Sequence, residues 1–417
     1  DYAILQRITA TGNQLDSALE KLERLDMIRK KEDSVEIKYY FKHAMVQDVV
    51  YNGILIRDRR VIHERIAVAM EQLFQSRLSG FFETLALHYS VGQSVYKAID
   101  YLMKSGQKSK KRYAVDEAHQ YYQRAYELLH DLPERSTRRT VLLLNVLIEW
   151  FFVFNVRGIF NEMVELLKQH EEEAATLASP YLQGMFYCCM GWAMQRREAL
   201  QESYDYLLKA LQIGERADDC NVMAYACGCL VWTCTDMGLL EKAEVYGRRA
   251  EALLAHMETD QELIRIILTG TGIALWFRGA AKQCRLIGQM LLAYGEKGAD
   301  IRSKSDGYLV YAMGHFAAGN LSQSIEYCNM AIGSSAEMVH SFNSKFLLAY
   351  THLWNEQVDE AEAILDDILQ FTETYGYEYL GSTARALAGL VSLARGNLRN
   401  GVRIIMERMA GFRSGGK

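Results

Sequence analysis

A turn-type residue recurs through the last two thirds of the chain at nearly constant spacing. It is usually glycine, and consecutive copies lie 37 to 41 residues apart, at Gly158, Glu198, Gly238, Gly279, Gly319, Glu356 and Gly396. A fixed period of this length indicates a solenoid, in which each unit cannot bury its apolar face alone and stacks on its neighbours. The sequence therefore predicts recognition along an extended surface.

Other positions keep the same phase. Seven residues before each turn stands a mostly small or apolar residue: Phe151, Gly191, Val231, Gly272, Ala312, Ala349 and Gly389. Five residues after each turn come mostly small residues: Met163, Ser203, Ala243, Cys284, Ser324, Ala361 and Gly401. Twelve residues after it stand His170, Ala210, Ala250, Leu291, Ala331, Ile368 and Arg408, and only the first and last copies are polar.

Composition favours a folded, nearly all-helical protein. Half of the 417 residues are hydrophobic, 24% are charged and only two are proline, Pro133 and Pro180. Proline breaks helix interiors, so its scarcity fits long helices. The net charge of −5 gives no general attraction to nucleic acid or to an anionic membrane.

The most apolar run, Val141 to Val156, contains Asn145 and Glu149 and is shorter than a bilayer crossing. We interpret it as a core helix and expect no membrane partner. The eight cysteines lie mostly where helices take small apolar residues, which suits a reducing cytoplasm. Cys220, Cys227, Cys229 and Cys234 do not have the paired spacing of a zinc site, so we expect no metal and no cofactor.

Residues 1–57 differ from the array. Apolar spacing predicts a helix from Gln14 to Ile28, followed by a polar turn from Arg29 to Ser34. Alternation from Val35 to Phe41 then predicts a strand, and His43 to Ile56 a second helix. This order predicts a winged-helix-like module, or another small α+β cap.

Residues 58–133 are expected to form linking helices and atypical first repeats, and residues 134–412 a regular array. The predicted fold class is all-α with a small α+β amino-terminal module. The array would be an α-α superhelix of helical hairpins with a period of about 40 residues.

Segments such as Leu240–Glu244 (LEKAE) and Asp359–Glu362 (DEAE) resemble tetratricopeptide repeats, although the period exceeds the usual 34 residues. The resemblance implies a superhelix whose inner wall is built by the first helix of each repeat. By that placement the wall would carry Phe152, Trp192, Trp232, Trp276, Met313, Phe316 and Tyr350. We expect a protein or peptide ligand in this concave groove. The alternative is that the longer helices hide these rings between hairpins.

The run Phe41–Asp48 (FKHAMVQD), with Tyr51 following, resembles the winged-helix segment of the signal transduction ATPases with numerous domains. It especially resembles that of multidomain proteins that join a class III adenylate or guanylate cyclase, or a protein kinase, to such an ATPase and a helical-repeat tail. In that class a histidine at the start of this helix senses the nucleotide phosphates, which by motif would be His43. Ala44 departs from the family's usual acidic residue, and His43 could instead cap or pack the helix.

The chain has no G-x-x-x-x-G-K-[ST] phosphate loop, no cyclase motif and no recognisable catalytic triad, so we do not expect it to be an enzyme. The resemblance implies a regulatory sensor or scaffold that works with an upstream ATPase module. The alternative function is a transcriptional regulator whose winged helix binds DNA and whose repeats sense an inducer. The candidate DNA-reading helix, Gln14 to Leu25, carries Asp16, Glu20 and Glu23, so we do not expect nucleic acid as a partner. A third alternative is a small-molecule pocket inside the superhelix.

Overall fold

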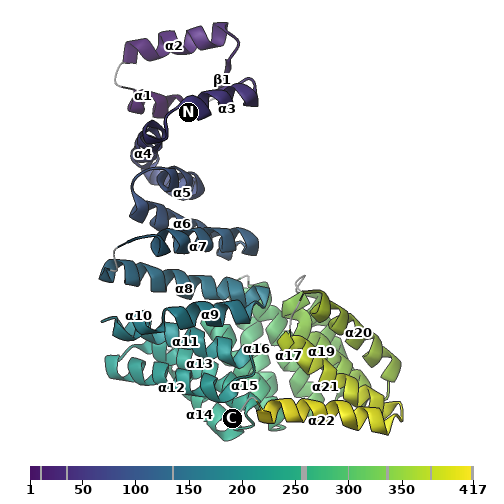
Figure 1. Cartoon of the computed structure of the whole chain (residues 1–417). Coiled ribbons are helices and arrows are strands. Elements are labelled where there is room, and N and C mark those ends of the chain that lie inside the picture. Colours follow the sequence, from purple (N-terminus) through teal and green to yellow (C-terminus); the bar gives the residue numbers. More distant parts are fainter. Residues whose placement is uncertain are drawn as a thin grey trace. The chain divides into compact units, whose positions relative to one another are not determined.

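The computed structural model describes residues 1–9, 12–33, 36–133, 136–254, 261–298, 300–334, 338–375 and 378–414. Contacts divide the chain into two compact units, Asp1–Val153 and Phe154–Lys417. The division falls inside a helix, whereas the sequence places domain boundaries near residues 57 and 133, which stay predictions. Figure 1 shows the elements of both units along the chain.

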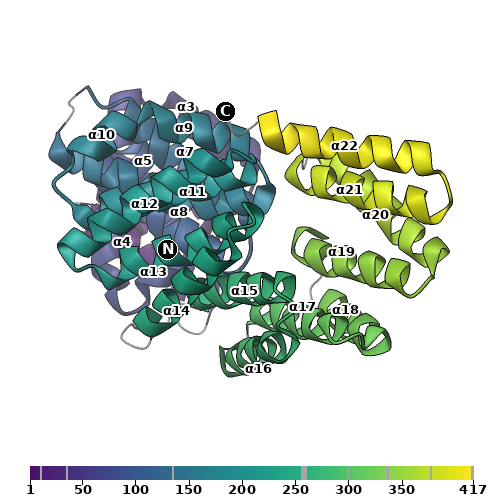
Figure 2. The same cartoon turned by 90° about the horizontal axis from the view of Figure 1, so that it is seen from below.

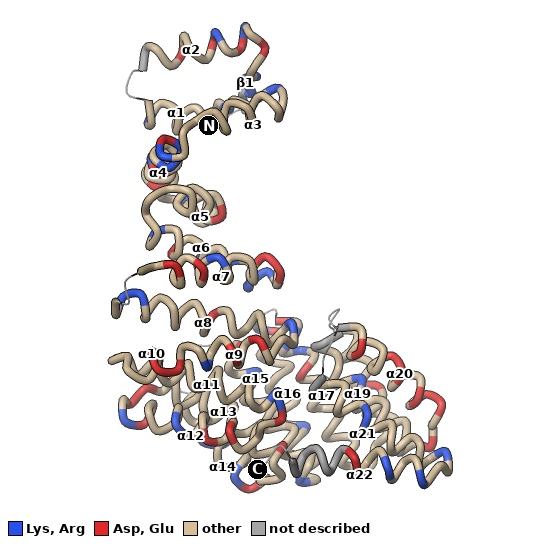
Figure 3. Tube along the Cα trace, in the orientation of Figure 1, with Lys and Arg blue, Asp and Glu red and all other residues tan. Residues whose placement is uncertain are grey.

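Unit 1 is helical apart from one β-ribbon. Its elements are α1 (Tyr2–Ile8), α2 (Gly12–Arg24), β1 (Ile28–Asp33), β2 (Glu36–Phe41), α3 (Ala44–Gly53), α4 (Ile56–Leu73), the 3₁₀ helix η1 (Gln75–Phe81), α5 (Phe82–Val91), α6 (Val95–Lys111), α7 (Val115–His130) and α8 (Thr137–Arg157). α4 carries charges of both signs (Figure 3). A hydrogen bond joins α4 to α1, in which Nη2 of Arg7 donates to Oε1 of Gln72 at 2.9 Å. A small core of Leu15, Leu19 and Ile28 lies under the ribbon.

The polar turn predicted at Arg29–Ser34 is wrong, because most of this segment is strand β1. β1 pairs antiparallel with β2, with Ile28 opposite Phe41 and Lys31 opposite Lys38. The sequence hides this strand because its polar residues make no period-two pattern, and strand pairing satisfies the backbone regardless of side chain. Ser34 and Val35 lie outside the described residues.

α8 is, within the described ranges, the helix that is long and apolar enough to cross a membrane by length and composition. Its apolar side chains Leu143, Leu144, Val146, Leu147, Trp150 and Val153 are buried against protein. Buried core helices of globular proteins pass the same test. The burial agrees with the core helix that the sequence predicts.

Unit 2 consists of antiparallel helical hairpins in chain order. After α9 (Phe160–Gln169) and α10 (Glu171–Thr176), the hairpins are α11 (Pro180–Arg196) with α12 (Leu200–Ala217), α13 (Cys220–Asp236) with α14 (Leu240–Leu254), α15 (Gln261–Phe277) with α16 (Ala281–Gly298), α17 (Ile301–Ala317) with α18 (Leu321–Gly333), α19 (Met338–Trp354) with α20 (Val358–Tyr375), and α21 (Glu378–Ala394) with α22 (Leu398–Ser414). The first helices of successive hairpins pack on one another, as the run from α15 to α21 shows in Figure 2. The predicted helical-repeat fold is confirmed.

The repeating turn residue ends the first helix of each hairpin. All seven copies have positive φ, from 60° at Glu356 to 81° at Gly396. Only glycine adopts the left-handed backbone conformation at a helix end without an energetic penalty, because a Cβ atom there clashes with the following carbonyl oxygen. This explains why glycine holds five of the seven positions.

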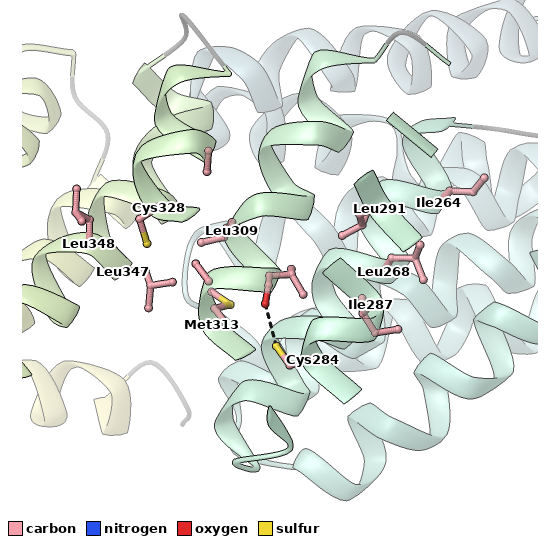
Figure 4. Packing of buried hydrophobic residues seen from close by; sticks show 13 residues of the cluster. Ile264, Leu268, Cys284, Ile287, Leu291, Leu309, Met313, Cys328, Leu347 and Leu348 are labelled. Atoms are coloured by element: carbon pink, nitrogen blue, oxygen red, sulfur yellow. Dashed lines mark hydrogen bonds between the residues drawn. The ribbon is translucent and has the colours of Figure 1, made fainter. Parts of the chain in front are cut away.

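The small residue five positions after each turn is buried in every copy. Where it is polar, it bonds to the first helix of the next hairpin: Ser203 meets Thr233 at 2.9 Å and Ser324 meets Thr351 at 3.3 Å. Cys284 does the same through its thiol, which donates to the carbonyl of Val310 at 3.2 Å (Figure 4). The column is therefore the seam between hairpins, and it must be small so that three helices can meet.

Turn glycines and seam glycines should respond differently to an added methyl group. At Gly279 nothing lies within 4 Å of an added Cβ, so Gly279→Ala should cost only the left-handed backbone penalty of about 1 kcal/mol. Glu356 already bears that penalty, so Glu356→Gly should stabilise unit 2 by about 0.5 kcal/mol after the entropy of glycine is subtracted. Urea denaturation of each variant measures both effects.

Gly272→Ala is the control for packing, because its new Cβ would lie 2.5 Å from Cγ1 of Val310. It should destabilise more than Gly279→Ala. A loss of stability on Glu356→Gly would contradict the role assigned to these turns.

Candidate functional site

Four aromatic rings from three consecutive hairpins contact one another in unit 2. Trp276 of α15 lies 6.0 Å from Phe316 of α17 and 6.3 Å from Tyr350 of α19, measured between ring centroids. Phe316 is 5.3 Å from Tyr350 and 6.2 Å from Trp354, the last residue of α19. We call Trp276, Phe316, Tyr350 and Trp354 the aromatic cluster.

The contact between Trp276 and Tyr350 joins hairpins that are not neighbours in the array. In a solenoid each repeat normally contacts only its immediate neighbours. Here α15 and α19 belong to hairpins separated by the α17–α18 hairpin, yet two of their rings touch. Repeats two apart approach each other more closely on the inner side of a curve, where the radius is smallest. Placement of the aromatic cluster on the inner wall stays a prediction that this contact favours.

Part of this aromatic surface is open to solvent. Trp354 is 62% exposed and Phe277, whose ring lies 4.8 Å from Trp276, is 58% exposed. Trp276 and Phe316 are half-buried on one core cluster and Tyr350 on the next. Trp276, Phe316 and Tyr350 are therefore held in place by the core, while Trp354 and Phe277 offer apolar surface to solvent, and this combination is the form of a binding hot spot.

Trp192 and Trp232, which the sequence places on the same wall, form a separate pair with centroids 5.8 Å apart. Trp192 is only 6% exposed and its Nε1 donates to Oδ1 of Asn155 at 2.9 Å. Nε1 of Trp232 donates to the backbone oxygen of Ile266 at 2.9 Å. Arg196 lies over both rings. These contacts join successive hairpins, which is the alternative that the sequence left open for these two residues.

Two other predicted wall residues lie elsewhere. Met313 is 5% exposed and belongs to the core shared by α15 to α19. Phe152 falls in unit 1, where its ring meets the edge of Tyr113 and Lys110 lies over it. The structure thus brings together Trp276, Phe316 and Tyr350 and not the remaining members.

Sequence reasoning missed Trp354 and Phe277. The wall was read at two fixed positions, six and three residues before each turn, and both Trp354 and Phe277 stand two residues before a turn. Trp354 follows Tyr350 by four residues, so the two share a helix face. An i, i+4 aromatic pair at a helix end was the available signal.

His43 lies at the N-cap of α3 and is exposed, with no side-chain hydrogen bond to the helix start. Its backbone oxygen accepts from the amide of Val46 at 3.1 Å. The imidazole is therefore not used as a helix cap, one of the two structural roles that the sequence left open. Its assignment to nucleotide sensing stays a prediction.

Apart from His43, unit 1 contains a pair of histidines, His63 and His88, that links three helices. Nδ1 of His63 on α4 is 3.0 Å from Nδ1 of His88 on α5, and Nε2 of His63 is 3.0 Å from the hydroxyl of Tyr51 on α3. Arg59 lies over the Tyr51 ring. Burial lowers the pKa of His88 to about 4, and the charge of His63 acts in the same direction. Burial and the nearby Arg59 also lower the pKa of His63. The pair is therefore neutral near pH 7.

The cysteines are packing residues. Burial raises the pKa of Cys227 to about 11 and that of Cys229 to about 12, so both stay as thiols, which are poor nucleophiles and metal ligands. Within the described residues, no group of three His, Cys, Asp or Glu side chains could hold a metal ion.

No protein-family model matches the chain. An uncharacterized protein of Rhizobium meliloti (strain 1021) is 21% identical over 280 residues, which cover 64% of this chain. The matched stretch is 27% of that protein, so the chain spans about a quarter of its curated relative.

Solved structures share the helical-repeat fold. A signal transduction ATPase with numerous domains from Pyrococcus horikoshii, with a tetratricopeptide repeat sensor, aligns over 99% of this chain and 59% of its own, at TM-score 0.56 and 14% identity. A Rap protein complexed with competence and sporulation factor aligns over 88% and 93%, at TM-score 0.58 and 11% identity. The Rap conjugation gene regulator of plasmid pLS20, in complex with a Phr peptide, aligns over 89% and 94%, at TM-score 0.50 and 12% identity. The chain is therefore a tetratricopeptide-like helical-repeat protein.

The histidine pair predicts acid sensitivity of unit 1. The folded-state pKa of His88 lies below its ordinary value of 6.5, so the unfolded chain binds the proton first as the pH falls. The contribution of His88 to the free energy of unfolding should be fully present above pH 6.5 and should decrease as the pH falls from 6.5 to about 4. Below pH 4 this group should cause no further loss. In His88→Gln the decline should be smaller. Thermal unfolding from pH 8 to pH 4, followed by circular dichroism, measures it; parallel profiles for both proteins would contradict the assignment.

Proposed function

We propose that this chain is a non-catalytic interaction and sensor module whose aromatic cluster binds a peptide segment of a partner protein. The observation that carries the proposal is the contact of rings from three hairpins, with Trp354 and Phe277 largely exposed. Large aromatic side chains that are held from below and open above are the residues that dominate peptide and protein interfaces.

The similar structures support the peptide class. Two of them are Rap proteins whose structures contain competence and sporulation factor or a Phr peptide. A third carries a tetratricopeptide repeat sensor within a signal transduction ATPase. At 11–14% identity these likenesses concern the fold, so the ligand of this chain is argued from its own exposed rings.

Unit 1 would transmit the signal to an ATPase module, as its resemblance to the winged-helix segment of signalling ATPases implies. α3 exposes Met45 at 79% and Val49 at 71%, beside the exposed His43. An apolar helix face of this extent is the kind of surface that another module covers. We place this function in the cytoplasm, and the ATPase would in turn control a nucleotide cyclase. The coding sequence upstream tests this part: an ATPase phosphate loop there is the expected finding, and a DNA-binding or transport module would contradict it.

DNA binding by unit 1 is the weaker hypothesis. α2 carries the carboxylates Asp16, Glu20 and Glu23 against the cations Lys21 and Arg24, and Arg24 is paired with Glu20 at 3.2 Å. A helix that enters a groove must neutralise phosphates, and this one offers more carboxylates than cations.

Peptide selection on the whole chain tests the main proposal. Peptides from a displayed random library should enrich on the wild type and lose at least about tenfold in affinity for the double variant Phe277→Ala/Trp354→Ala, because hot-spot truncation costs about 2 kcal/mol or more. Both side chains are mostly exposed, so the variant should fold, as a melting curve will check. Tyr294→Ala, an exposed aromatic residue of α16 outside the cluster, is the matched control. Equal binding to all three proteins would rule out the aromatic cluster as the site.

A further inference from the structure

We infer that the segment that binds the aromatic cluster is basic, with an arginine or lysine side chain set against the rings. This inference rests on the proposed function and names the chemistry of the partner. It follows from how the chain treats its other aromatic groups, from the helix ends that meet at the cluster, and from where the nearby cations point.

The chain supplies a cation to many of its other aromatic rings, and all of these except Tyr51 are buried or half-buried. A lysine or arginine lies within 6 Å of the ring centre at Tyr51 (Arg59), Tyr89 (Lys97), Tyr101 (Lys104), Phe152 (Lys110), Tyr96 (Arg138), Trp192 and Trp232 (Arg196), Tyr187 (Lys209) and Tyr204 (Lys242). Ring faces carry negative charge density, so each contact is attractive. Among the described residues, no such contact involves Trp276, Phe316, Tyr350 or Trp354. The aromatic cluster therefore has ring faces but no cation of its own.

Two arginines on the same hairpin as Trp276 are bonded to other groups. Arg278, which directly follows Phe277, is paired with Glu244 on α14. Arg285 on α16 donates through Nη1 to the backbone oxygen of Gly314 at 3.2 Å. His315, in the last turn of α17, brings no charge near pH 7, because burial and the charge of Arg285 lower its pKa. The charge at the rings is thus left for a ligand to supply.

Three helix ends add to the preference for positive charge. Trp276, Phe316 and Trp354 stand at the last or second-last residue of α15, α17 and α19. Because their rings touch, the carboxyl ends of these helices meet at the cluster. Each carboxyl end carries a partial negative charge that favours a nearby cation. An acidic peptide segment would be repelled by the carboxyl ends of the three helices and by the negative faces of the rings. Charge complementarity therefore favours a basic peptide segment.

The ring geometry leaves room for that cation. Phe316 and Trp354 meet nearly perpendicular, at 88°, and Trp276 and Tyr350 at 87°. An edge-to-face contact covers only one face of a ring. Trp354 is 62% exposed, so most of its ring surface remains accessible to a ligand. A guanidinium group can lie on such a face while its aliphatic stem covers Phe277 or Tyr350.

Matched peptides test the charge alone. The probes are a short synthetic peptide that alternates arginine with leucine, and the same peptide with citrulline in place of arginine, which keeps the shape and removes the charge. Binding to the full chain is followed by tryptophan fluorescence at two salt concentrations. The arginine peptide should bind about tenfold more tightly, and Trp354→Leu should reduce that preference to about threefold or less. Tyr294→Leu on α16 should leave it unchanged.

Each outcome decides the inference. A preference for arginine that Trp354→Leu removes supports it. Equal binding of both peptides, lost in Trp354→Leu, overturns the charge requirement and leaves peptide binding at the cluster intact. A preference that persists in Trp354→Leu overturns it as well, because the cation then binds elsewhere. Absence of binding by both peptides, or self-association of the chain that Trp354→Leu abolishes, also overturns it, and the peptide selection then judges the proposed function separately.

Discussion

Unit 2 depends on close packing at the seam between consecutive hairpins. There the second helix of one hairpin places Ser203, Cys284 or Ser324 against the first helix of the next, with the side chain buried and bonded. Glycines open the same space from the other side: an added Cβ at Gly191 would meet Leu207, and one at Gly272 would meet Val310. Small residues at both contacts set the spacing of the helices, and the spacing, repeated along the chain, sets the curvature.

Curvature then decides which aromatic side chains become a surface. The same helix position holds Trp192, Trp232, Met313 and Tyr350, yet their environments differ. Trp192 and Trp232 find hydrogen-bond acceptors in neighbouring hairpins and serve as packing. Around α15, α17 and α19, rings from hairpins two apart meet, and the exposed rings of Phe277 and Trp354 lie beside them. The candidate binding surface is thus formed by several hairpins together, and no single repeat contains it.

Unit 1 handles its polar groups differently. Cations and carboxylates pair across helices, as Lys108 does with Glu83 at 2.8 Å, and Tyr51, His63 and His88 link α3, α4 and α5. α3 itself leaves Met45 and Val49 uncovered. In the function proposed above, this open face of α3 would contact an ATPase module.

The sequence by itself determined the repeat. Seven turn residues in phase, each later found at positive φ, and a buried small residue five positions beyond each were sufficient to predict the hairpins, because both requirements are local and recur with the backbone geometry. It also grouped Trp276, Phe316 and Tyr350, whose rings the structure brings together, and their place on a concave wall stays a prediction. Strand β1 was missed because its residues are polar and only pairing with β2 defines it. Whether Trp192 is packing and Trp354 surface was decided by the tertiary structure alone, since a ring's exposure depends on contacts with residues that lie 34 or more positions away. The helical period determines on which face of its helix a side chain lies. Whether that face contacts another hairpin or solvent depends on how the assembled array curves.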